Sequence, residues 1–138
     1  MKVRRACEPV MEGGTYADIS HPTAKAVPER PWGDLFDPAR CNGDSPGTTP
    51  VIAFPSGASA KGCLDMCGNV WEWTESERDD GHMRYVMVRG GCHLRVTGSM
   101  WYTASGAQPC DVHEKVPLLG DGIDRLSTVG FRCVRAAS

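Results

Sequence analysis

Turn-forming residues interrupt this chain so often that a long helix has no clear segment in which to form. The clearest case is the segment 31–50, PWGDLFDPARCNGDSPGTTP, where Pro, Gly, Asp or Asn recurs every few residues. The chain of 138 residues contains 16 Gly and 10 Pro. We therefore expect ordered loops to make up much of the molecule, packed around a small sheet.

Three short apolar segments predict strands: 51–55 (VIAFP), 83–91 (MRYVMVRGG) and 129–136 (VGFRCVRA). The second is the strongest because it combines β-branched and aromatic residues with a Gly-Gly stop. Segment 94–106 fits either a strand or irregular core. The charged segments, which we expect to be solvated loops, are 75–82 and 111–128. This pattern indicates an α+β protein with a small, mostly antiparallel sheet and little helix.

The size and charge of the chain exclude several classes of protein. Its length fits a single domain over residues 1–138, with an irregular segment at 1–30 and the core at 31–138. Seventeen acidic against fifteen basic residues leave no basic footprint for nucleic acid. No apolar run approaches the roughly 20 residues of a membrane-spanning helix. The positive start lacks the apolar segment of a signal peptide, so we expect a soluble, cytoplasmic protein without nucleic-acid or membrane partners.

The seven cysteines do not read as a complete disulfide framework, because their number is odd and no export signal precedes them. We expect most of them to be buried thiols. Cys63 and Cys67 are four residues apart, but a zinc site needs a second such pair, and the chain supplies none. The histidines share no ligand spacing; they are His21, His82, His93 and His113.

The segment 64–72, LDMCGNVWE, better suits a hard cation. Calcium binds carboxylate and backbone carbonyl oxygens at irregular spacing. Asp65 and Glu72 could supply carboxylates, and Gly68 and Val70 could supply carbonyls from the same tight turn. This pattern predicts a calcium-binding loop.

A purely structural interpretation of the same segment is equally good on chemistry alone. Asp65 and Asn69 would then cap turns, and Glu72 would form an ion pair with Arg89 or Arg132.

Four blocks in a fixed order resemble a known family. They are PWGDLFDPARCN (31–42), TTPVIAFPSGASAKGCLDMCGNVWEWT (48–74), VMVRGG (86–91) and VGFRCVRA (129–136). Together they resemble the formylglycine-generating enzymes, or sulfatase-modifying factors, a superfamily that includes a domain of the ergothioneine-synthesising sulfoxide synthases. The resemblance implies a variant of the C-type lectin fold over roughly residues 30–136. Family domains are longer and carry a further helix before the first block, so a version truncated at the N-terminus is expected here.

The resemblance also implies metal ligands. For a first calcium ion they are the side chains of Asp65 and Glu72 and the carbonyls of Gly68 and Val70. A second calcium site would fall at Asn42 and the carbonyl of Gly43, with Asp44 as a further candidate in a shortened loop.

The chemistry of the family's enzymes depends on residues that this chain lacks. In the formylglycine-generating enzymes, two cysteines five apart follow the RGG strand, bind copper and oxidise a substrate cysteine with molecular oxygen. Counted from Gly91, those positions here hold Arg95 and Met100, which cannot act as thiolates. Cys92 is alone and displaced by three residues. Copper and the oxidase reaction are therefore not expected.

Three functions remain open from the sequence. The favoured one is a non-catalytic, calcium-stabilised module in which the loops 92–106 and 107–128 shape a cleft for a small ligand or a protein. The second is an active superfamily enzyme, formylglycine-generating or another oxidoreductase, with a changed active site. Its groove candidates are Cys92, His93, Arg95, Trp101 and Tyr102, for which ordinary packing is the simpler interpretation. The third is a structural protein completed by homodimerisation, with an apolar patch at the interface.

Overall fold

The computed structural model describes residues 28–98, 105–118 and 126–133, and within them the protein is mostly sheet and loop. Helix is limited there to two short 3-10 helices, as the turn-rich sequence predicts. The elements are η1 (Pro38–Arg40), η2 (Pro55–Gly57), β1 (Trp71–Asp79), β2 (Arg84–Arg89), β3 (His113–Pro117) and β4 (Val129–Gly130). In the described part of the chain, no helix has the length and apolar character needed to cross a membrane.

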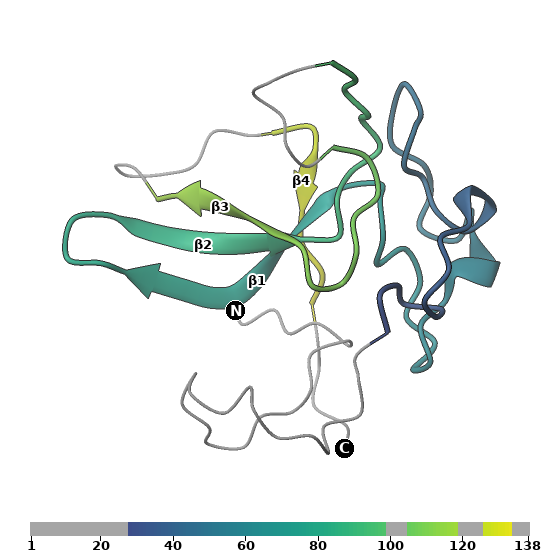
Figure 1. Ribbon diagram of the computed structural model, residues 1–138, viewed down its shortest axis with the longest axis horizontal. Coiled ribbons are helices and arrows are strands. Elements are labelled where there is room, and N and C mark those ends of the chain that lie inside the picture. The colour runs from purple at the N-terminus through teal and green to yellow at the C-terminus, as the bar shows by residue number, and fades with distance from the viewer. Residues whose placement is uncertain (1–27, 99–104, 119–125, 134–138) are drawn as a thin grey trace.

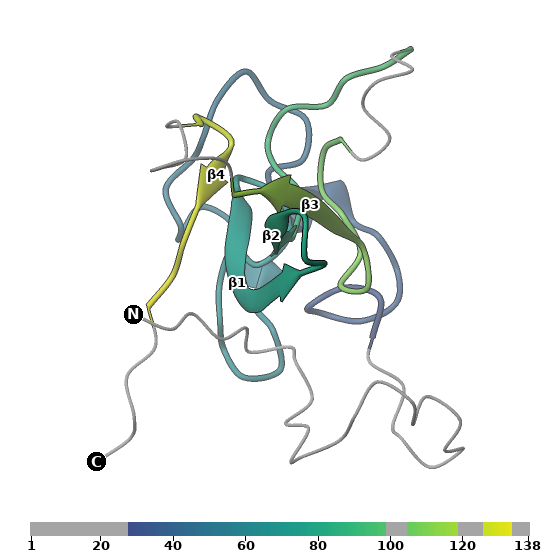
Figure 2. The same ribbon diagram turned by 90° about the vertical axis from the view of Figure 1, so that its left-hand side faces the viewer.

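The four strands form one sheet in the order β3-β2-β1-β4. β1 and β2 form an antiparallel hairpin, and β3 pairs antiparallel with β2. β4 adds a short parallel pairing, in which Trp71 faces Val129 and Glu72 faces Gly130. Figure 1 shows the hairpin projecting to one side and the loops of residues 28–70 gathered at the other end of the sheet, and Figure 2 shows β4 beside β1. The prediction of a small, mostly antiparallel sheet is confirmed.

The prediction of a charged loop at 75–82 is wrong, because β1 continues to Asp79. The last strand residues are charged because both faces of the projecting hairpin are exposed there, so composition alone resembles a loop. Arg84 of β2 donates from Nε to Glu77 of β1 at 2.8 Å, which links the two strands across the hairpin. Asp80 accepts backbone hydrogen bonds from His82 and Met83 and closes the turn.

Two further strand predictions need correction. Segment 51–55 is a turn followed by η2, because the prolines on either side lead into turns in which Ala53 N donates to Pro50 O and Gly57 N to Phe54 O. Segment 111–128 is not all loop, since it contains β3, a strand in which His113, Lys115 and Pro117 are exposed in alternation. Of the predicted strand at 129–136, only Val129–Gly130 is paired within the described residues.

The core lies under the centre of the sheet. Trp71, Val88 and Cys92 are buried together, and Trp73 and Val116 pack against them with Val129. Both tryptophans of the WEW segment therefore anchor the start of β1 to the core.

Candidate functional site

The loop before β1 turns sharply and joins three distant segments. Asp65, Gly68 and Asn69 all have positive φ, at 58°, 83° and 61°. Asn69 N donates to Asn42 O at 2.7 Å, and Asn69 O accepts from His93 N at 2.8 Å. A Cβ at Gly68 would collide with the carbonyl of Asn42, so only glycine permits this close approach.

A network of amide side chains fills the junction between these segments. Asn42 and Asn69 are buried, and Asn42 Nδ2 donates to Asn69 Oδ1 at 3.3 Å. Asn69 Oδ1 also accepts from Thr49 N at 2.9 Å, and Asn69 Nδ2 donates to Asp65 Oδ2 at 2.6 Å. These contacts show why the motif contains Asp and Asn four residues apart: the two side chains hold the turn, as the structural interpretation of the sequence expects.

Asp65 has one oxygen that this network leaves out. Its Oδ1 is buried and has no hydrogen-bond partner among the described residues. Burial raises the pKa of the Asp65 carboxyl, and the hydrogen bond from Asn69 opposes that effect. A buried carboxylate oxygen without a partner is the kind of atom that a bound cation would satisfy.

Glu72 is only 5% exposed, and its charge is met by an arginine. Arg132 donates from Nε to Glu72 Oε2 at 2.8 Å and from Nη2 to Glu72 Oε1. The same guanidinium donates to the carbonyls of Leu64 and Asp65, each at 3.1 Å. Of the two partners that the sequence left open for Glu72, the structure selects Arg132.

The two predicted carboxylate ligands therefore differ in how well they suit calcium. The free oxygen of Asp65 suits a cation, whereas both oxygens of Glu72 accept from Arg132. Among the residues that the structure describes, no group of three or more His, Cys, Asp or Glu is placed to hold a metal. At the second predicted site, Asn42 Nδ2 donates to Gly47 O and Thr49 Oγ1.

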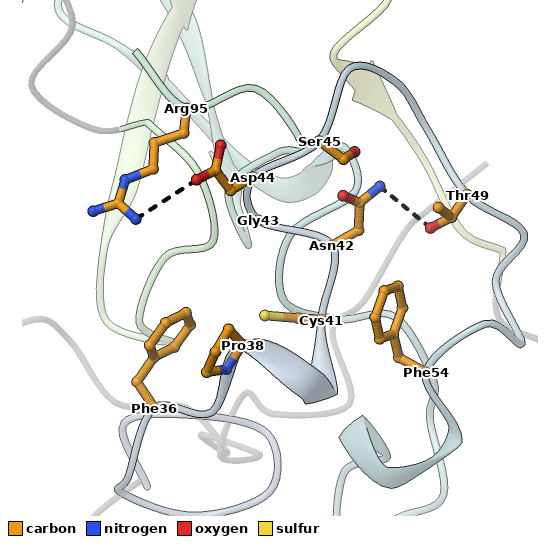
Figure 3. A pocket seen from close by; sticks show the side chains of 10 residues that line it. All are labelled: Phe36, Pro38, Cys41, Asn42, Gly43, Asp44, Ser45, Thr49, Phe54 and Arg95. Atoms are coloured by element: carbon orange, nitrogen blue, oxygen red, sulfur yellow. Dashed lines mark hydrogen bonds and ion pairs between the residues drawn. The ribbon is translucent and has the colours of Figure 1, made fainter. Parts of the chain in front are cut away.

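Two adjoining cavities lie beside the amide network. The first has a volume of about 290 Å³ and is lined by Phe36, Cys41, Asn42, Asp44, Phe54 and Arg95, among others. Figure 3 shows the two phenylalanines on either side of Cys41, with Arg95 turned toward Asp44 above them. The second cavity, of about 210 Å³, is lined by Arg30 and the segment 105–107 and shares Phe36, Gly43 and Arg95 with the first.

Arginine side chains give these cavities their charge. Arg30 lies over the ring of Phe36, 4.8 Å from its centroid, and donates to Ala107 O at 3.4 Å. Its Nε is buried without a hydrogen-bond partner in the described part of the chain. Arg95 forms a loose ion pair with Asp44 at 4.0 Å, and both side chains are more than half exposed.

Of the predicted groove residues that the structure describes, Cys92 and His93 are buried and Arg95 lines the cavities. Cys92 is in the core, and His93 is buried with Nδ1 3.2 Å from Ser45 O, so it ties two loops together. Arg95 is the member of that set that lines both cavities. Trp101 and Tyr102 lie outside the described residues, as does Met100.

The sequence analysis missed Phe36 and Phe54 as cavity residues. Phe36 lies in a predicted loop, where an aromatic side chain was a signal that could have pointed to a binding surface, whereas Phe54 lies in the segment 51–55 that was predicted as a strand.

Comparison with known proteins agrees with the motif blocks. The model of the sulfatase-modifying factor enzyme 1-like domain matches residues 5–137. The inactive C-alpha-formylglycine-generating enzyme 2 of Bos taurus is 30% identical over 121 residues, which cover 78% of this chain and 37% of that protein. The hercynine oxygenase of Mycolicibacterium smegmatis is 45% identical over 58 residues, covering 40% of this chain and 14% of that protein.

A shorter match is closer in sequence. The formylglycine-generating enzyme of Mycobacterium tuberculosis is 61% identical over 31 residues, which cover 22% of this chain and 10% of that protein. This chain spans between 11% and 37% of the length of the first three relatives. The domain match over nearly the whole chain, together with the ordered motif blocks, shows that the chain belongs to the family of formylglycine-generating, or sulfatase-modifying factor, enzymes.

Proposed function

We propose that this chain is a non-catalytic ligand-binding module, built on a C-type-lectin-like scaffold of the formylglycine-generating enzyme family. The observation that carries the proposal is the position of Arg95. It stands where the resemblance places a copper-binding cysteine, and it lines both cavities. An always-charged guanidinium with five donors recognises anions but supplies no thiolate chemistry.

The lining of the cavities suits a ligand that joins an anionic group to a flat apolar one. Arg30 and Arg95 both line the second cavity, and no acidic residue is among the described residues of its lining. The ion pair of Arg95 with Asp44 is long and exposed, so a ligand carboxylate or phosphate could replace it at little cost. Phe36 and Phe54 offer apolar surface in the adjoining space.

Calcium remains part of the proposal as a stabiliser of the scaffold. Asp65 and Glu72 would bind it through side chains, and Gly68 and Val70 through carbonyls. The oxygen of Asp65 that lacks a hydrogen-bond partner supports this assignment. Calcium would supply positive charge to that oxygen, in competition with Arg132 for Glu72. The second site, at Asn42 and Gly43, is proposed on the resemblance alone.

The test uses aromatic carboxylates as probes. Benzoate and larger aromatic acids are titrated into isotope-labelled protein, and backbone amide shifts are followed by NMR. We expect shifts at residues 105–107 and around Phe36, saturating at millimolar concentration, and no saturation with the uncharged benzamide. Arg95→Gln should weaken binding about tenfold or more, because a charge-assisted hydrogen bond is worth about 1.5–3 kcal/mol.

The matched control is Arg78→Gln, which removes an exposed arginine of β1 that does not line either cavity. It should leave binding unchanged. An equal loss of affinity in both variants would mean that the probes respond to net charge alone. Chemical-shift changes scattered over the sheet would refute the assigned cleft.

Homodimerisation is a second candidate, favoured by exposed apolar side chains near the two 3-10 helices. Leu35 is 84% exposed and Ile52 is 73% exposed. If these residues form an interface, Leu35→Ser with Ile52→Ser should shift the mass in solution from dimer to monomer. A concentration-independent monomer for the unmodified chain would exclude this function.

A further inference from the structure

Cys41 and Cys67 are neighbours across the short parallel bridge between Asn42 and Gly68. Cys41 directly precedes Asn42, and Cys67 directly precedes Gly68, so the two cysteines occupy matching positions in the two segments. Adjacent strands lie about 4.8 Å apart. This spacing falls within the range of Cα separations, about 4.4–6.8 Å, that a disulfide requires.

The two side chains meet in the interior. Cys41 is 5% exposed and Cys67 is 1% exposed. A hydrogen bond between the two thiols, together with burial, raises the pKa of Cys41, so the attack of Cys41 is the slow step of an exchange reaction. Cys67 also donates to Gln108 O at 3.4 Å and accepts from Arg30 Nη1 at 3.7 Å. Arg30 thus places positive charge beside the sulfur of Cys67, the thiol that attacks in the second step of the exchange proposed below.

Of the two thiols, Cys41 is the one that lines the first cavity described above. Cys41 lines the 290 Å³ cavity, and Figure 3 shows its sulfur directed into the space between Phe36 and the amide network. Cys67 is not among the described residues that line that cavity, and it is almost fully buried. A small reagent entering the cavity would therefore meet Cys41 first, with Cys67 positioned behind it to resolve the product.

From this arrangement we infer that Cys41 and Cys67 form an intramolecular disulfide by exchange with low-molecular-weight organic disulfides. Cys41 loses its proton to solvent and its sulfur attacks one sulfur of the reagent, which forms a mixed disulfide and expels one thiolate. Cys67 then attacks the Cys41 sulfur, closes the protein disulfide and expels the second thiolate. The two cysteines lose two electrons, the organic disulfide gains them, and the two expelled thiolates take up the two protons.

The crosslink would fix the cavity in its shape. It covalently joins the segment containing Asn42 to the turn containing Asn69, which hydrogen bonds link in the reduced protein. Because Cys41 is part of the cavity wall, closure also withdraws its thiol from any bound ligand. The thiol pair thus provides a modification site distinct from the arginine side of the cleft.

The test uses the full reduced chain and oxidised glutathione at roughly pH 8, where thiol exchange is efficient. Remaining thiols are alkylated, and the intact mass and tryptic peptides are measured. We expect loss of two hydrogens and a crosslink between the peptide that begins at Cys41 and the one that begins at Gly62, since Lys61 separates them. The reaction should proceed without any added ligand.

Cys63→Ser is the matched control, because Cys63 lies in the same tryptic peptide as Cys67. This variant should form the same crosslink at the same rate. Cys67→Ser should stop at a glutathione adduct on Cys41, and Cys41→Ser should form neither product. A wild-type chain that stays reduced, or a crosslink that needs Cys63, would overturn the inference. These two outcomes are read from the wild type and Cys63→Ser, so they decide the matter even if the other variants fold poorly.

Discussion

Arg132 neutralises Glu72 from a position 60 residues further along the chain, and the guanidinium donates at the same time to the carbonyls of Leu64 and Asp65. The carboxylate of Glu72 and two carbonyls of the turn before β1 therefore accept hydrogen bonds from one arginine near the end of the described residues. This contact joins two motif blocks that are distant in the sequence: the turn before β1 is held by the segment that follows β4.

Removing this arginine should destabilise the protein strongly. Arg132→Met leaves a buried carboxylate without its partner, and we expect a loss of about 3 kcal/mol in the free energy of unfolding, measured by urea denaturation. Glu72→Gln in the same molecule should restore part of the loss. The control is Arg84→Met in the exposed pair with Glu77, which should leave the urea midpoint nearly unchanged. Similar effects of the two arginine substitutions would contradict the importance of the buried pair.

Calcium should stabilise the wild-type chain if the proposed site forms. At a calcium concentration 100 times the dissociation constant, binding raises the free energy of unfolding by about 2.7 kcal/mol. The measurement is thermal unfolding in EDTA and in increasing calcium, with magnesium as the comparison cation. Asp65→Asn should abolish the calcium effect. A melting temperature that does not respond to calcium would show that Arg132 alone satisfies the turn.

The same carboxyl should make metal-free stability depend on pH. Burial raises the pKa of Asp65 above its ordinary value of 3.8. A group whose pKa is higher in the folded state adds stability below its unfolded pKa and loses that contribution as pH rises through the folded pKa. In EDTA, the wild type should therefore lose stability from about pH 4 upward relative to Asp65→Asn. Parallel pH curves for the two proteins would contradict the effect of burial.

Gly68 should tolerate no side chain. Gly68→Ala imposes a positive φ on alanine and drives a Cβ into the carbonyl of Asn42, so we expect a loss of at least about 2 kcal/mol. Gly62→Ala is the control, because Gly62 has φ of 76° but an empty surrounding space. It should cost only about 1 kcal/mol from backbone strain. The difference between the two urea midpoints measures the contact with Asn42.

Oxidation of a peptide cysteine should not occur. The wild-type chain is incubated with copper(I), oxygen and a peptide that carries a sulfatase-type cysteine motif, and aldehyde formation is followed by mass spectrometry. With arginine at 95 and methionine at 100, we expect the peptide mass to remain unchanged. Copper binding without aldehyde formation would not contradict this prediction, because the chain has other thiols that can bind copper. An aldehyde product above the level of a protein-free control would show that the chain is an active enzyme.

The sequence predicts some strands of this fold well and misses others for a physical reason. β2 is evident because Val86 and Val88 are buried and Tyr85 is half-buried in the middle of the sheet. The end of β1 and all of β3 are hidden because their exposed faces carry charged side chains, so composition resembles a loop. The apolar residues at 51–55 suggested a strand, yet two prolines and the turns that they start make this segment irregular.

The candidate site was predictable only in its local part. Turn residues such as Asp65 and Asn69 are four apart, and their side-chain contact follows from the motif itself. The choice of Arg132 as the partner of Glu72 depends on the parallel pairing of β4 with β1, which no local pattern encodes. For the same reason, the cavity formed by Phe36, Phe54 and Arg95 emerges only when three loops are placed together.

The parallel pairing of β1 with β4 also bears on how the chain folds. The β1–β2 hairpin is local and can form early, whereas β4 can join only after a long loop has closed, at an entropic cost that grows with loop length. Proteins dominated by such distant pairings fold slowly. Until residues 129–132 dock, the edge of β1 that receives β4 is open to other strands, so aggregation should compete with folding during synthesis.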